Sequence, residues 1–61
     1  MLFEVWTEDE EGHQELIETT ASMSEAVKLA ETAVLDGAFA ATIFQETEDG
    51  NSREIERFES A

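Results

Sequence analysis

The sequence contains no cysteine among its 61 residues and only one histidine, His13. It can therefore form no disulfide and no thiolate metal site, and a metal centre built from several histidines is excluded. Lysine and arginine are also scarce, with three in total against sixteen aspartates and glutamates. The formal net charge of −13 is well beyond the magnitude of roughly 2 to 8 that suffices for solubility in a small domain. Such a charge repels nucleic acid and anionic lipid, and it attracts basic surfaces.

Long apolar runs are missing as well, since the longest are only a few residues, such as "AFAA" at 38–41. None approaches the length needed to span a membrane. The first residues, "MLFEVW", lack the basic region of a signal peptide, and we expect a cytoplasmic protein. The length supports one domain, residues 1–61, and a hydrophobic content of 41% favours a folded chain over a disordered one.

What the sequence does contain is a pattern of short strands separated by turn signals. Strands are predicted at 2–7, 14–20, 39–46 and 53–58, and in the first of them β-branched and aromatic residues alternate with polar ones. The acidic segment 8–13, which contains Gly12, predicts one hairpin turn, and the Asp-Gly pair within 47–51 predicts another. In the last strand Ile55 and Phe58 lie at opposite parities, so a regular strand cannot place both on one face.

One amphipathic helix is expected between the second and third strands. Ser22 suits the N-cap, Glu25 three residues later completes a capping box, and Gly37 suits the left-handed position that ends a helix. Apolar residues recur at steps of three and four along one face: Met23, Ala26, Val27, Ala30, Ala33 and Val34. The element order ββαββ predicts an α+β fold, with this helix on one face of a four-stranded antiparallel sheet of order 2-1-3-4.

A single helix covers only one face of such a sheet, and alternation divides the apolar residues between the faces. The helix side is predicted to carry Phe3, Val5, Ile17, Phe39 and Ile43. The open side is predicted to carry Trp6 and Phe44, together with Leu2, Leu16 and Phe58. Exposed aromatic residues indicate a contact site, including one for a homodimer. The alternatives are that Glu4 and Arg57 lie over the rings or that the faces are inverted. Leu35, opposite the alanine stripe, is expected to fold over the helix end.

Catalysis and metal binding find little support in the residues. His13 lies in a predicted turn, and no nucleophile–base set is evident, so we expect no enzyme and no catalytic residue. The acidic turns offer oxygen ligands but lack the alternating spacing of a calcium loop, so no metal site is predicted. The glycines are single, which excludes a phosphate-cradling loop, and no cofactor is expected.

Three explanations of the acidity remain open: solubility, adaptation to a high-salt cytoplasm, and a negative surface that competes for a basic site on another protein. Duplex DNA carries one charge for about 1.7 Å of its axis, and rows of glutamates on strands can imitate that density. Glutamates suited to such rows are Glu4, Glu15, Glu18, Glu46, Glu54 and Glu56, with the two turns.

The stretch "ELIETTASMSEAVKLAETAVLDGAFAATI", residues 15–43, resembles small phage-encoded inhibitors of host proteins, such as those of bacterial RNA polymerase, with one helix on an antiparallel sheet. The resemblance covers about half of the chain and implies a short protein that acts by occupying a host protein. Those inhibitors contact their target through basic residues after the helix, and 38–45 contains none here.

The leading hypothesis is a non-enzymatic protein-binding module, an inhibitor or nucleic-acid mimic that occupies a basic site on a host protein. Trp6 and Phe44 are the expected anchors, with Leu2 beside them. The expected acidic contacts are Glu4, Glu8, Asp9, Glu10 and Glu11. The alternative is a structural domain that self-associates through the open sheet face.

Overall fold

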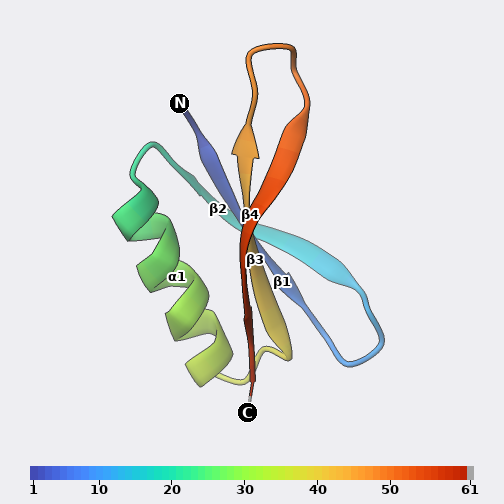
Figure 1. Ribbon diagram of the computed structural model, residues 1–61. Coiled ribbons are helices and arrows are strands. Elements are labelled where there is room, and N and C mark those ends of the chain that lie inside the picture. The colour runs from blue at the N-terminus through green and yellow to red at the C-terminus, as the bar shows by residue number, and fades with distance from the viewer. Residues whose placement is uncertain (61) are drawn as a thin grey trace.

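The computed structural model describes residues 1–60 and has the element order ββαββ (Figure 1). The strands are β1 (Phe3–Glu8), β2 (Gln14–Thr20), β3 (Ala40–Glu46) and β4 (Ser52–Glu59), and the helix is α1 (Met23–Leu35). All strand pairs are antiparallel, and the sheet order is β2-β1-β3-β4. The predicted α+β fold and strand order are confirmed, and the predicted strand bounds differ from these by at most one residue.

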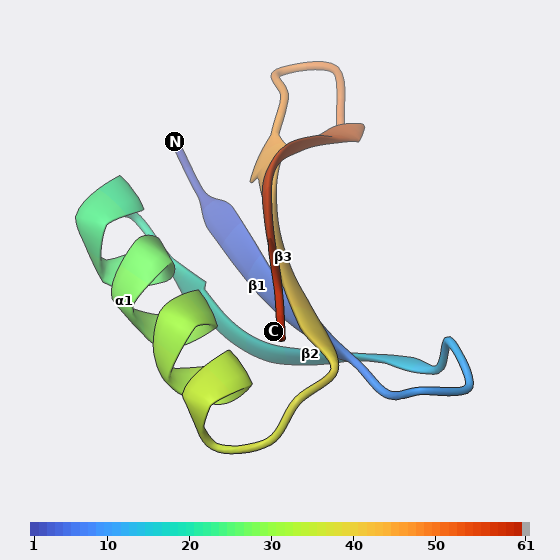
Figure 2. The ribbon, with the colours of Figure 1, turned by 60° about the horizontal axis from the view of Figure 1, so that its bottom comes forward.

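The helix lies along one side of the sheet, whereas the β1–β2 and β3–β4 hairpins project away from it and diverge (Figure 2). Gly12 and Gly50 have φ values of 88° and 86°, a left-handed conformation that favours glycine in tight turns. In the described residues, no helix is long and apolar enough to cross a membrane.

Two β-bulges interrupt the regular alternation of the sheet. Ile43 pairs with Glu56 and Phe44 with Glu54, so Ile55 is an extra residue in β4. The extra residue shifts the parity, which lets both Ile55 and Phe58 pack against the core beneath the helix. In β2 the same irregularity leaves Ile17 as the extra residue between the partners of Val5 and Trp6.

The ends of α1 are capped by the expected residues. The Ser22 hydroxyl accepts the Glu25 N–H at 3.2 Å. The Gly37 N–H bonds to the Val34 carbonyl and the Ala38 N–H to the Ala33 carbonyl, with Gly37 at φ 116°, which is a Schellman ending. The second hydrogen bond of the predicted capping box would join the Ser22 N–H to the Glu25 side chain. The Ser22 N–H donates instead to the Thr20 hydroxyl.

Replacing the N-cap tests how much α1 depends on this end. Ser22→Ala leaves the Glu25 N–H without its side-chain acceptor, and we expect the free energy of unfolding to fall by about 1 kcal/mol. Ser22→Asp retains an acceptor and adds a charge that suits a helix N-terminus, so we expect stability close to that of the original chain. Urea unfolding followed by circular dichroism measures both, and an equal loss in the two variants would contradict the capping role.

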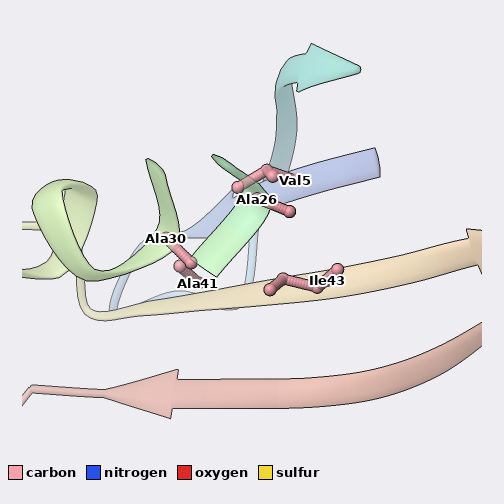
Figure 3. Close-up of a cluster of buried hydrophobic side chains, with 5 residues drawn as sticks. All are labelled: Val5, Ala26, Ala30, Ala41 and Ile43. Carbon is pink, nitrogen blue, oxygen red and sulfur yellow. The ribbon is translucent and has the colours of Figure 1, made fainter. Parts of the chain in front are cut away.

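The core lies between α1 and the two central strands, β1 and β3 (Figure 3). Its fully buried members are Val5, Ala26, Ala30, Ala41 and Ile43. Alanines on both surfaces, Ala26 and Ala30 on the helix and Ala41 on the sheet, allow the two to approach closely. Half-buried residues around them complete the cluster: Phe3, Met23, Val27, Leu29, Ala33, Val34, Ile55 and Phe58.

Two predicted side-chain positions, those of Phe58 and Leu35, were wrong. Phe58 packs beneath the helix and not on the open face, because the β4 bulge changes its parity. Phe39 and Ile17 were predicted on the helix side, and Ile17 does border α1, but they are 40% and 42% exposed because α1 lies over the central strands and leaves the sheet margins uncovered. Leu35 does not fold over the helix end and is 85% exposed.

Candidate functional site

Trp6 and Phe44 lie side by side on the face of the sheet opposite α1. Trp6 pairs with Thr42, and Phe44 pairs with Glu4. These positions alternate along the strands with the core pair Val5 and Ile43, so they belong to the opposite face. The ring centroids of Trp6 and Phe44 are 6.4 Å apart at an interplanar angle of 83°, an edge-to-face contact. This face assignment follows the sequence prediction, and both residues are half-buried rather than fully exposed.

The surroundings of the aromatic pair explain its partial burial. The Trp6 indole Nε1–H donates to Glu4 Oε1 at 3.1 Å, which holds the ring against its own strand. A hollow of about 120 Å³ beside the rings is lined by residues from all four strands. These lining residues are Glu4, Trp6, Gln14, Phe44 and Ser52. Because the two edge strands contribute to one small hollow, this face of the sheet is concave there.

Arg57 joins three strands on the same face. Its Nη1 donates to Glu8 Oε1 at 3.2 Å and to Thr42 Oγ1 at 3.3 Å, and its Nε lies 3.5 Å from Glu59 Oε2. The Arg57 hydrogen bond lowers the pKa of Glu8, and the same bond raises the pKa of Arg57. Thr42 is 1% exposed beneath this network. One of the three basic side chains therefore holds the sheet together.

The first hairpin presents its carboxylates in two different ways. Asp9 belongs to the turn itself, because its Oδ1 accepts the backbone N–H groups of Glu11 and His13, both at 2.9 Å. The His13 ring nitrogen Nδ1 lies 3.2 Å from Asp9 Oδ2. Glu10 and Glu11 make no side-chain hydrogen bond in residues 1–60 and are exposed. The turn thus uses Asp9 for its geometry and displays the next two carboxylates.

An open hollow of about 750 Å³ lies between this hairpin and the segment that joins α1 to β3. Its acidic lining consists of Glu8, Asp9, Glu10, Glu11 and Glu15. Phe39 adds an exposed aromatic ring, which the sequence had predicted on the helix side of the sheet. The exposure of Phe39 could have been predicted from its place in the sequence, because it follows Gly37 and Ala38 in the connecting segment just before β3 begins.

The eight predicted binding residues do not form one surface. Trp6, Phe44 and Glu4 share the concave face, and Glu8 connects this face to the acidic hairpin. Leu2 lies apart from them, in a hollow with Glu46, Glu48 and Arg53 near the second hairpin.

The chemistry available to these groups is that of a charged surface. Within residues 1–60, no three histidine or carboxylate side chains converge as a metal ion requires. The nearest carboxylate partner of the His13 ring is Asp9, itself held by the turn. The carboxylates therefore spread charge over the hairpins instead of focusing it on one point.

Comparisons with family models, with curated proteins and with solved structures give no match for this chain. The candidate site therefore rests on the residues and geometry of the chain itself.

Hydrogen bonds to Asp9 and Asp49 in the two turns predict that the protein loses stability at low pH. The His13 and Glu11 backbone amides lower the pKa of Asp9, and the Thr47 hydroxyl and Asn51 lower that of Asp49. A lowered pKa in the folded state means that these contacts stabilise the fold above the unfolded pKa. This contribution is lost as the pH falls through the folded pKa, below the ordinary value of 3.8.

NMR titration of the side-chain carboxyl carbons measures these values. We expect Thr47→Val to raise the pKa of Asp49, because it removes the largest cause of the shift, and to leave Asp9 unchanged. An unchanged Asp49 titration in this variant would contradict the assigned cause.

Proposed function

We propose that this protein is a non-enzymatic binding protein that occupies a basic, nucleic-acid-binding surface of another protein. The observation that carries the proposal is its charge density. All charged side chains lie within residues 1–60, and thirteen net negative charges over a long axis of 33 Å amount to about one per 2.5 Å. Duplex DNA has one per roughly 1.7 Å, so the protein reaches about two-thirds of that density.

The distribution of partners for these charges supports the same function. Among residues 1–60, ion pairs involve only three of the sixteen carboxylates, those of Glu8, Asp9 and Glu59. The other thirteen have no cationic side chain within 4 Å. Their charge is available to a basic partner, which it would attract at long range.

The aromatic pair supplies the apolar part of the proposed contact. Trp6 is already fixed by Glu4 and Phe44, so little side-chain freedom is lost when a partner covers it. Tryptophan is also enriched among the residues that dominate binding energies. In this proposal the hairpins provide the charge that guides encounter, and the concave face provides the anchor.

Capture followed by competition tests the function. The purified protein is immobilised and exposed to a lysate of its native cells at about 150 mM salt, where the Debye length is near 8 Å. We expect it to retain a basic protein that duplex DNA releases at constant ionic strength. Retention of nothing, or of proteins that DNA does not displace, would overturn the proposal.

Matched charge variants locate the surface. Glu10→Gln, Glu11→Gln and Glu48→Gln together remove three charges from the hairpins. Glu25→Gln, Glu31→Gln and Asp36→Asn remove three from the helix side, where all three residues are exposed. We expect the first set to weaken retention about tenfold and the second much less. A larger loss from the helix set would contradict the use of the hairpins.

Self-association is a second candidate, because Leu35 is a large apolar side chain that is 85% exposed. The net charge of −13 on each copy opposes this association in dilute salt. Sedimentation equilibrium separates the two, since a stable dimer at about 150 mM salt supports the second candidate and a monomer supports the first.

A further inference from the structure

The outer edge of β2 is one of the two edges at which the sheet ends. β2 is a terminal strand of the sheet and pairs only with β1. Residues 14–19 are all exposed, and in residues 1–60 no backbone hydrogen bond ties β2 to anything beyond β1. The backbone groups that point away from β1 are thus free to pair with another extended chain.

Apolar groups lie on both sides of this edge. Leu16, on the concave face, is 44% exposed, and Ile17, on the helix side, is 42% exposed. Ile17 borders a groove of about 400 Å³ between β2 and α1, in which Leu29, Ala33 and Ala38 supply apolar surface. The groove exists because α1 lies mainly over β1 and β3.

The charges of the edge define what it can accept. Glu15 and Glu18 are the charged residues of β2, and Glu25 and Asp36 border the groove against one cation, Lys28. A second copy of the chain would place like charges beside one another, which destabilises strand pairing. An extended segment with lysine or arginine at these positions would instead be attracted.

The opposite edge is a poorer acceptor. β4 carries two of the three basic residues in the chain, Arg53 and Arg57, against three glutamates, so its net charge is −1, compared with −2 for β2. Its large apolar residues, Ile55 and Phe58, are half-buried against the core. The edge of β2 therefore combines free backbone groups with exposed large apolar side chains and the more negative net charge of the two edges.

We propose that β2 binds an extended basic segment of the partner protein by strand addition, an inference that rests on the proposed function. The segment pairs with the β2 backbone and places an apolar side chain in the groove beside Ile17. Basic residues on the same face of the segment lie near Glu15 and Glu18, whose partners on β1, Thr7 and Val5, are two residues apart. The bulge at Ile17 bends the edge, so the paired segment is short.

The probe is a blocked heptapeptide, TKTVTKT, in which the valine and both lysines lie on one face of a strand. Its control is the same peptide with N-methyl groups on alternate amides, which keeps the side chains but removes the donors needed for pairing. We expect the parent peptide to shift the NMR signals of residues 14–20 and to slow the exchange of their amide hydrogens. The methylated peptide should bind at least about tenfold more weakly, a loss of about 1.4 kcal/mol.

Two double variants of the chain complete the test. Glu15→Lys with Glu18→Lys reverses the charge of the edge, and Glu10→Lys with Glu11→Lys reverses the same charge on the hairpin. We expect the first to weaken peptide binding about tenfold and the second less than about threefold. NMR spectra of both variants without peptide establish that the fold is retained.

Strand addition is overturned if the peptide does not bind, if the methylated peptide binds equally well, or if the signal changes map to the hairpins. None of these results bears on the capture of a DNA-displaceable partner, which tests the proposed function separately. If capture succeeds while the peptide fails, the protein binds its partner through another surface.

Discussion

Ile43→Ala is expected to lower the free energy of unfolding by about 2–5 kcal/mol. Ile43 is the largest of the fully buried side chains, and it lies on β3 beneath α1. A domain of this length has a total stability of about 3–9 kcal/mol. The truncation therefore removes a large share of it, and the variant is expected to be partly unfolded at 37 °C.

Two other substitutions calibrate this result. Ile43→Val removes one methyl group and is expected to cost about 1 kcal/mol. Leu35→Ala removes more atoms than Ile43→Val, but the Leu35 side chain is 85% exposed, so this substitution should change stability by less than about 0.5 kcal/mol. Urea unfolding of the three variants gives these values, and equal losses from Ile43→Ala and Leu35→Ala would contradict the position of the core.

Raising the salt concentration from 10 mM to 1 M is expected to stabilise the protein by about 2–5 kcal/mol. The Debye length falls from about 30 Å to about 3 Å over this range. At the lower concentration it matches the 33 Å length of the molecule, so the thirteen net charges all repel one another. Unfolding separates these charges, because an unfolded chain of this length has a radius of gyration of about 24 Å, against 11.0 Å for the fold.

Potassium chloride and sodium chloride should act alike, since screening depends on ionic strength and not on the cation. Thermal unfolding at several salt concentrations measures the effect. A variant with Glu10, Glu11 and Glu48 replaced by glutamine should show a smaller increase. A midpoint that does not rise with salt would mean that charge repulsion is not a significant cost to this fold.

Local signals were sufficient to predict the elements and their order. The turns contain glycines that adopt positive φ, and Ser22 and Gly37 define the helix ends by hydrogen bonds within a few residues. Such contacts depend on adjacent sequence alone. The antiparallel order followed because a short turn joins each strand pair and one helix returns the chain to the other edge of β1.

The bulges were not predictable, because they depend on which residues face one another across strands. The opposite parity of Ile55 and Phe58 was visible in the sequence, and the shifted register of β4 explains it. The exposure of Ile17 and Phe39 was missed for a related reason. Alternation assigns a side chain to a face, but it does not tell how far a single helix extends over that face.

The candidate site was predictable in part. Composition identified the acidic residues, and alternation placed Trp6 and Phe44 on the face opposite the helix. The sequence also allowed Glu4 and Arg57 to lie over the rings, and Glu4 does bind the Trp6 indole. Arg57 instead bonds to Glu8 and Thr42, a contact between strands that no local pattern specifies.

The alanine-rich contact between helix and sheet affects how the protein responds to temperature. Alanines bury little apolar surface, and the heat capacity change of unfolding depends on the surface exposed. For 61 residues this change is at most about 0.9 kcal/mol/K, and the unfolding enthalpy near 60 °C is about 43 kcal/mol. Stability should therefore vary slowly between 5 and 40 °C, and melting should be broad. A substitution that costs 1 kcal/mol would move the midpoint by about 8 °C.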